Sequence, residues 1–328
     1  MRTSRLAGMA PVLMMAALLA GGHAGVAHAA YPEKPIKLIV PFPAGGPTDA
    51  MARIVSEKMT QSLGQTVIVE NRGGAGGVIA TEAAAASAAN GYTLFFATTG
   101  TMTINPSIYP NMGVKPLKAF DPIGMVASTE NVLVVAPSLK IDTVQDLVAQ
   151  AKSEPGTFTF GSAGVGSSNH LSGELLKDMA GIDILHVPYK GSAAALTDLL
   201  GGRISMMFDT ISNALPNIQA GKVVPLGVTG TAKSPALPAV PTIADAGLPG
   251  FQVSIWFGLV APHGTPSDAI KTLNASLNKI LAESDVQAKL QSFGATPTPG
   301  SPEVFASQMN QDEAKWSRLI KTSGMKVN

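Results

Sequence analysis

Hydrophobic residues occur along the chain in short runs, and longer amphipathic stretches separate most of these runs. Residues 49–63 and 144–153 are two of the stretches with helical spacing. Short strands that alternate with helices of this length are typical of βαβ units with mostly parallel sheets. We therefore predict an α/β fold, with helix only from residue 267 to 324. The runs rich in β-branched or aromatic residues predict strands at 36–40, 66–70, 93–97, 131–136, 158–162, 184–189, 204–209, 223–229 and 251–261.

Two of these runs resemble each other, since "ENVLVVAP" (130–137) and "WFGLVAP" (256–262) share an apolar approach to Val-Ala-Pro. The first follows three βα units and the second follows a further set, which suggests a chain that crosses to a second lobe and returns. One long doubly wound sheet is the alternative, but about 300 residues exceed a usual single domain. We expect lobe 1 to comprise residues 30–129 and 254–328, lobe 2 to comprise residues 130–253, and ligand to bind in the cleft between them.

The N-terminus has the features of a secretory signal peptide. Arg2 and Arg5 precede an apolar run over residues 6–19, and "AHA" at 27–29 offers a cleavage site with small residues. A membrane anchor is the alternative, but the apolar run is short for a bilayer span. We therefore expect residues 1–29 to be removed and the product to be exported to the periplasm.

Charge and cysteine content narrow the classes of partner. The 328 residues include 23 Lys and Arg against 22 Asp and Glu, with no basic cluster. A chain so close to neutral argues against nucleic acid or an anionic membrane as the partner. The sequence has no cysteine, so disulfides and thiol catalysis are excluded, and the fold must depend on its core.

The sequence lacks the usual signatures of catalysis. After the leader its histidines are His170, His186 and His263, and none has zinc-ligand spacing. The glycine-rich segment 161–168, "GSAGVGSS", fits neither a nucleophile elbow nor a nucleotide-binding loop. We expect no metal and no cofactor. An exported hydrolase-like enzyme that acts on a small carboxylate or ester through Ser168 and His170 is kept as the alternative.

Several loops suited to binding an anion follow predicted strands. They are "PFPAGGPTD" (41–49), "TTGTMTINP" (98–106), "GSAGVGSSNHLSGELL" (161–176) and "FDT" (208–210). They supply hydroxyl groups and the N–H groups of helix N-termini, and all should gather at the carboxyl edges of the sheets. Hydrogen bonds to an anion contribute about 1.5–3 kcal/mol each, and micromolar affinity needs about 8 kcal/mol. These loops can therefore hold a carboxylate without arginine.

Together these segments carry a resemblance that covers nearly all of the chain after the leader. With "VENRGGAGG", "GYTLFFATTG", "HVPYKGSAAALTDLLGGRI" and "ALPAVPTIADAGLPGF", the chain resembles the Bug family of periplasmic solute receptors of tripartite tricarboxylate transporters. The resemblance implies a Venus-flytrap binding protein with two α/β lobes joined by two crossing strands. It implies a small carboxylate as ligand, either an amino acid, a di- or tricarboxylate or an aromatic acid. The membrane components of a transporter are a further implied partner, and we expect a monomer.

The resemblance also implies the positions of the site residues. For Asp49 a helix-capping role and a ligand contact are both open, with contact slightly favoured, and for His170 a packing role is the stronger alternative. Phe42 and Trp256 belong either to the core or to the wall of the cleft. The implied residues are Phe42, Ala44, Gly45, Gly46, Asp49, Thr98, Thr101, Ser162, Ala163, Ser167, Ser168, His170, Tyr189, Lys190 and Asp209.

Overall fold

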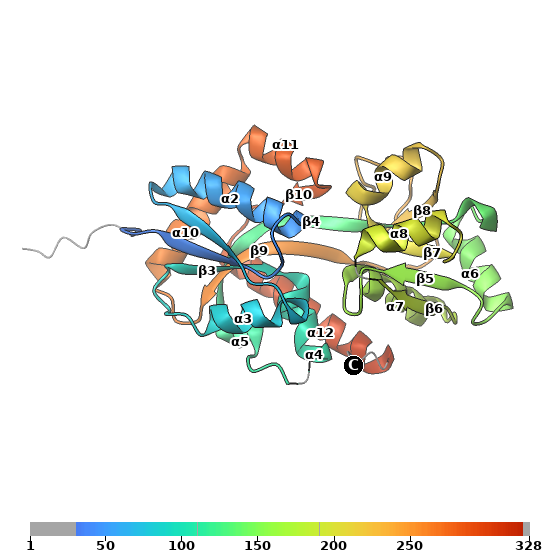
Figure 1. The fold of residues 1–328 in the computed structure, drawn as a ribbon, viewed down its shortest axis with the longest axis horizontal. Coiled ribbons are helices and arrows are strands. Elements are labelled where there is room, and N and C mark those ends of the chain that lie inside the picture. The colour runs from blue at the N-terminus through green and yellow to red at the C-terminus, as the bar shows by residue number, and fades with distance from the viewer. Residues whose placement is uncertain (1–30, 110, 190, 324–328) are drawn as a thin grey trace, which may run out of the picture.

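The computed structural model describes residues 31–109, 111–189 and 191–323. The predicted signal peptide and Lys190 lie outside these ranges. Figure 1 shows two α/β lobes placed end to end, with strands β4 and β9 running between them. This arrangement confirms the predicted two-lobed α/β architecture.

The sheet of lobe 1 has the order β2-β1-β3-β9-β4. The strands β1 (Ile36–Val40), β2 (Val67–Asn71) and β3 (Thr93–Thr98) are parallel, as βαβ units require. Strand β9 (Ser254–Pro262) runs antiparallel to β3 and to β4. The connections of this lobe contain α2 (Pro47–Leu63), η1 (Ala75–Gly77), α3 (Val78–Ala85), η2 (Gly100–Ile104), α4 (Asn105–Ile108) and α5 (Pro116–Ala119).

Strand β4 (Phe120–Val135) belongs to both lobes. Glu130 is its last residue opposite β9, and Asn131 is its first opposite β7 of lobe 2. The sequence pattern predicted only the second half of this strand, because Pro122 and Gly124 interrupt the first half, and the register with β9 shifts between them. The division of the chain at residues 129/130 and 253/254 stays a prediction.

The sheet of lobe 2 has the order β4-β7-β5-β6, with β8 paired to β4. Strands β5, β6 and β7 are parallel, whereas β7 and β8 run antiparallel to β4. The elements of this lobe are η3 (Pro137–Leu139), α6 (Val144–Ser153), β5 (Thr159–Ser162), α7 (Ser168–Ala180), β6 (Leu185–Pro188), α8 (Ser192–Leu200), β7 (Met206–Thr210), α9 (Ile211–Gln219) and β8 (Val224–Val228).

The C-terminal region returns to lobe 1 and then reaches toward lobe 2. It contains α10 (Ser267–Leu281), α11 (Ser284–Ser292), β10 (Ala295–Pro297) and α12 (Pro302–Ser323). The prediction of helix only was wrong here, because β10 pairs with the Ala127–Thr129 segment of β4. Three residues are too few to show alternation in a sequence. Figure 1 shows α12, in red, extending from lobe 1 toward α7.

Local sequence explains where the helices bordering the cleft begin and end. Ser167 caps α7 by accepting a hydrogen bond from the His170 N–H, and Gly181 ends the helix in the left-handed conformation. Gly46 precedes α2 and Gly64 ends it in the same left-handed way. Each lobe has its own buried apolar clusters, which fits a chain that folds without disulfides. Within the described residues, none of the helices is both long and apolar enough to cross a membrane.

Candidate functional site

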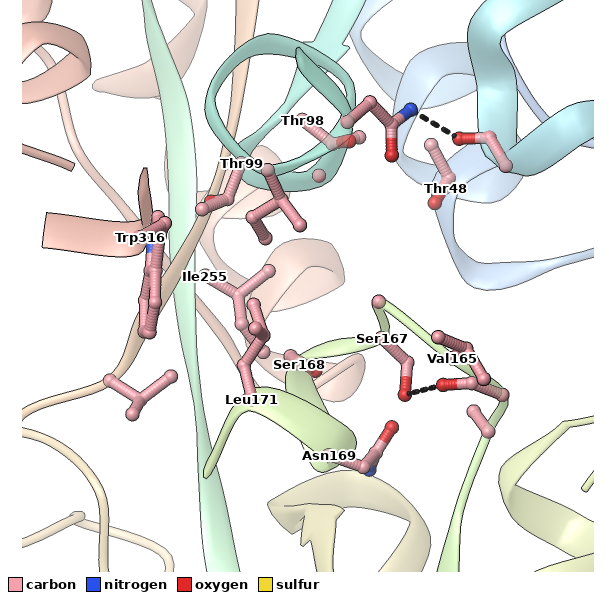
Figure 2. A pocket seen from close by; sticks show the side chains of 18 of the residues that line it. Thr48, Thr98, Thr99, Val165, Ser167, Ser168, Asn169, Leu171, Ile255 and Trp316 are labelled. Atoms are coloured by element: carbon pink, nitrogen blue, oxygen red, sulfur yellow. Dashed lines mark hydrogen bonds between the residues drawn. The ribbon is translucent and has the colours of Figure 1, made fainter. Parts of the chain in front are cut away.

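A cavity of about 410 Å³ lies between the lobes. Its walls come from both lobes and from the crossing strands, where Thr129 of β4 and Ser254 of β9 take part. Figure 2 shows Thr48 and Thr98 of lobe 1 facing Ser167 and Ser168 of lobe 2 across the space. The position between two lobes is typical of a ligand site.

Lobe 2 contributes the segment from Ala163 to Asn169, which joins β5 to α7. Gly164 and Gly166 have φ of +125° and +78°, a conformation that side chains rarely adopt. Ser167 Oγ donates to the Gly164 carbonyl at 2.7 Å (Figure 2) and accepts from the His170 N–H at 3.3 Å. Among the described residues, the N–H groups of Ser168 and Asn169 in the first turn of α7 have no acceptor. They are available to an anion in the cavity.

Lobe 1 contributes residues from three loops that follow its parallel strands. Phe42 comes from the first loop, Thr48 from the first turn of α2 that follows it, and Gly76 from η1 in the second connection. Thr98, Thr99 and Gly100 come from the turn that opens η2. The Thr99 hydroxyl accepts a hydrogen bond from the backbone N–H of Trp256 at 2.8 Å, which connects this turn to β9. Gly45 and Gly46 of "PFPAGGPTD" lie between Phe42 and Thr48 in the chain but do not line the cavity themselves.

The rest of the wall is largely apolar. It is formed by Ile255 and Phe257 of β9, Ile104 of η2, Leu171 of α7 and Trp316 of α12. Among the described residues, every side chain that lines the cavity is uncharged. Within these residues the arrangement combines hydroxyls and N–H groups with an apolar wall, and none of their side chains supplies a countercharge. The described residues also include no cluster of His, Cys, Asp or Glu that could hold a metal ion.

Five of the residues implied by the family resemblance line the cavity, namely Phe42, Thr98, Ala163, Ser167 and Ser168. The others that are described lie behind or beside the lining. Thr101 and Ser162 are fully buried and hydrogen-bond within their own turns. The Tyr189 hydroxyl donates to Asp198 at 2.7 Å. Ala44, Gly45, Gly46, Asp49, His170 and Asp209 also lie outside the lining, and a direct ligand contact for any of the implied residues stays a prediction.

Asp49 has hydrogen bonds at both carboxylate oxygens. Oδ2 accepts from the Gly45 N–H and from Arg53 Nε, each at 2.9 Å, and Oδ1 accepts from Asn71 Nδ2 at 2.9 Å. Burial opposes ionisation, but the hydrogen bonds and the charge of Arg53 hold the pKa of Asp49 below its ordinary value. This geometry favours a role in holding the loop over the ligand contact that the sequence slightly favoured.

Replacing Asp49 by asparagine should therefore weaken the fold and affect all ligands alike. An amide nitrogen would face the donors that now bond to one carboxylate oxygen, so we expect the free energy of unfolding to fall by about 1–3 kcal/mol. Urea denaturation measures this loss. Calorimetry with an amino acid and a simple dicarboxylate supplies the control, and a loss confined to the amino acid would show that Asp49 contacts its ammonium group.

Asp209 at the end of β7 is fully buried and accepts hydrogen bonds from the Thr210 N–H and from Asn213 Nδ2. Burial raises its pKa to about 7, and the two hydrogen bonds oppose this rise only in part. The adjacent Thr210 lines the cavity. Asp209 therefore supports the floor of the site from behind.

Because its folded-state pKa is raised, Asp209 should make the protein less stable as pH rises from about 4 to above 7. Asp209→Asn should remove this loss and stabilise the protein at pH 8.5 by roughly 1–3 kcal/mol, since one pKa unit corresponds to about 1.4 kcal/mol. The gain should shrink toward pH 4. Urea denaturation across this range checks it, with the exposed Asp268→Asn as control. A gain that does not change with pH would contradict this assignment.

Sequence reasoning missed the residues on the crossing strands and on α12. Thr129, Ser254, Ile255 and Phe257 lie within strands, and Trp316 is more than fifty residues beyond the last of them. Of the two aromatic alternatives, Phe42 lines the cavity, whereas Trp256 is a core residue whose Nε1 donates to Asp312 at 2.7 Å. Arg72 pairs with Glu70 and lies outside the lining.

The geometry does not favour the alternative of an enzyme that acts through Ser168 and His170. A catalytic serine would need a base within hydrogen-bond reach. The Nδ1 atom of His170 instead accepts from the Gly166 N–H at 3.1 Å, and its Nε2 atom lies 3.7 Å from Glu174 Oε1. His170 is therefore engaged with the loop and with its own helix.

Comparison with known proteins agrees with this site. Residues 51–325 match the model of the tripartite tricarboxylate transporter family receptor. The chain is 41% identical over 292 residues to "UPF0065 protein in tcbD-tcbE intergenic region" of Pseudomonas sp. (strain P51), covering 89% of this chain and 87% of that protein. It is 38% identical over 309 residues to protein BugT of Bordetella pertussis, covering 94% and 95%.

Solved structures give the same result. A Rhodopseudomonas palustris protein, Rpa4515 with adipate, has a TM-score of 0.79 and 36% identity, covering 91% of this chain and all of that one. MatC of the same species, with bound malate, has a TM-score of 0.76 and 32% identity, covering 88% and 100%. The periplasmic binding protein BugD has a TM-score of 0.76 and 36% identity, covering 90% and 100%. The chain thus belongs to the family of tripartite tricarboxylate transporter receptors, which bind solutes and are not enzymes.

Proposed function

We propose that the protein captures a small carboxylate in the cavity between its lobes, in the periplasm, for uptake or sensing. The observation that carries this proposal is the meeting of the first-turn N–H groups of α7 with the hydroxyls of Thr48 and Thr98 across one cavity. Preorganised donors of this kind bind an anion without a basic side chain. The adipate and malate named for two related structures are consistent with this ligand class.

We further propose that the ligand has an apolar body and no ammonium group. The wall formed by Ile255, Phe257, Leu171 and Trp316 can cover aliphatic or aromatic carbon. Among the described lining residues there is no carboxylate to pair with an ammonium, and burying an unpaired charge is costly. Aromatic monocarboxylates and medium-length dicarboxylates meet these conditions better than amino acids do.

Thermal-shift measurements with a panel of acids test the proposal. A ligand at 100 times its dissociation constant adds about 2.7 kcal/mol of stability, so adipate, benzoate, phenylacetate, malate and glutamate can be ranked directly. We expect the largest shift from an acid with an apolar body, and none from its primary amide. A larger shift with glutamate than with the other acids would contradict the proposed ligand class. No shift with any acid would contradict carboxylate binding.

The cellular part of the proposal has a separate test. The predicted signal peptide and the comparison with the periplasmic protein BugD support export. N-terminal sequencing of protein from a periplasmic extract should find a start near Ala30. Recovery of the uncleaved chain from the membrane fraction would contradict it.

A further inference from the structure

Two histidine rings are stacked directly behind the cavity loop of residues 163–169. His170 lies on α7 and His186 on β6, and their ring centroids are 3.7 Å apart with an interplanar angle of 13°. Phe160 of β5 stacks with both rings, its centroid 4.9 Å from that of His186 and 6.2 Å from that of His170. His170 is buried and His186 is half-buried. Neither ring lines the cavity, so the proposed carboxylate site leaves this pair without a role.

His170 is bonded to the loop directly, and His186 is linked to it through Ser162, the last residue of β5. His186 Nε2 lies 2.6 Å from Ser162 Oγ, and the same oxygen accepts from the Gly164 N–H at 3.1 Å. His170 Nδ1 accepts from the Gly166 N–H at 3.1 Å. The stack therefore fixes Gly164 and Gly166, the two glycines whose positive φ values turn the loop toward the cavity.

The surroundings of the pair favour uncharged rings. A nitrogen that accepts from the Gly166 N–H cannot carry a proton, so His170 Nδ1 is unprotonated. Burial, followed by the effect of His170, lowers the pKa of His186 to about 4. The charged groups that face the pair are Glu174, whose Oε1 lies 3.7 Å from His170 Nε2, and Lys177, which pairs with Glu174. Two imidazolium rings at this separation would repel each other strongly.

We propose that His170 and His186 are positioning residues of the binding site, which hold the loop of residues 163–169 in its anion-binding conformation as neutral hydrogen-bond partners. This inference rests on the proposed function, because the positioned groups are the N–H donors of Ser168 and Asn169. It assigns His186 a part in ligand affinity although the residue does not touch the cavity.

Hydrogen exchange on the ligand-free protein tests the positioning directly. In His186→Ala the Gly164 and Gly166 amides should exchange at least tenfold faster than in the wild type, after correction for intrinsic rates. His186→Gln keeps a neutral side chain that can donate to or accept from Ser162 Oγ, and it should restore most of the protection. His263→Ala is the matched control, because His263 is an exposed histidine that also has a polar partner, Asp121. Unchanged exchange in His186→Ala would overturn the inference. ¹⁵N spectra should show a neutral His186 ring at pH 5, and an imidazolium at His186 at pH 6.5 would also overturn the inference.

Ligand affinity gives the second test, with adipate and benzoate as probes at pH 7.5. Dissociation constants should rise at least tenfold in His186→Ala and in Ser162→Ala, and no further in the double variant, because both changes break the same link. His186→Gln and His263→Ala should stay within threefold of the wild type. If His186→Ala loses stability but keeps wild-type affinity, the histidine pair only stabilises the fold, and the proposal is contradicted. If the wild type binds neither acid, the proposed function fails, while the exchange experiment still decides whether the rings hold the loop.

Discussion

Replacing Ser168 by aspartate should reduce carboxylate affinity at least 100-fold without harming the fold. Ser168 is the first residue of α7 and lines the cavity. A carboxylate placed there would lie close to the bound anion, and two like charges 4 Å apart repel by about 4 kcal/mol at an effective dielectric constant of 20. The same charge at a helix N-terminus favours the helix by about 0.3–1 kcal/mol. Affinity and stability should therefore change in opposite directions.

Calorimetry with the best acid of the thermal-shift panel and urea denaturation measure the two effects. Ser267→Asp is the matched control, because Ser267 is an exposed residue at the same position of α10, away from the cavity. It should leave affinity unchanged. Ser168→Asn tests size without charge and should cost less than tenfold. Affinity of Ser168→Asp within threefold of the wild type would show that the anion does not bind at this helix.

Trp316 should be the wall residue whose truncation costs most stability. Its side chain on α12 is 1% exposed and packs with Ile104 and Leu171, so it joins the C-terminal helix to both sides of the cavity. Trp316→Ala should lower the free energy of unfolding by about 3–5 kcal/mol, as is usual for a large aromatic residue in a core. It should also weaken aromatic acids more than malate, because the apolar wall is lost.

Trp316→Phe separates packing from hydrogen bonding. Among the described residues, the buried Trp316 Nε1 has no hydrogen-bond partner. Phenylalanine keeps most of the apolar contact and removes a donor that contributes no bond in this structure, so it should cost less than half as much as alanine. Urea denaturation of both variants provides the comparison. Equal losses for the two would mean that the indole N–H is satisfied in solution.

The sequence was informative wherever a strand has a clear pattern and a loop follows it. Strand β1 has the predicted bounds, and the loops at Phe42, Thr98 and Ser167 reach the cavity. The first half of β4 was not predicted because proline and glycine interrupt its pattern. Strand β10 was not predicted because it is too short to show alternation. Thr129 and Ser254 line the cavity only because two strands cross between the lobes at that level. Such neighbours are set by topology, which periodicity does not encode.

Side-chain roles were harder to predict than positions. Asp49 and His170 belong to motifs that the family resemblance associates with the ligand. In the structure they instead accept hydrogen bonds from the backbone N–H groups of Gly45 and Gly166. The stacking of His186 on His170 joins residues on a strand and a helix that only the folded lobe brings together. Residue type and spacing identify polar groups near a site, but hydrogen-bond partners depend on packing.

One carboxylate should bind between the lobes through N–H and hydroxyl donors. Backbone amide chemical shifts, followed while the best acid of the panel is titrated into labelled protein, test it most directly. We expect the shifts to gather at residues 98–100 and 163–169, to saturate at one equivalent, and to be absent with the primary amide of the same acid. Equal shifts with the amide, or shifts confined to surfaces outside these two loops, would contradict it.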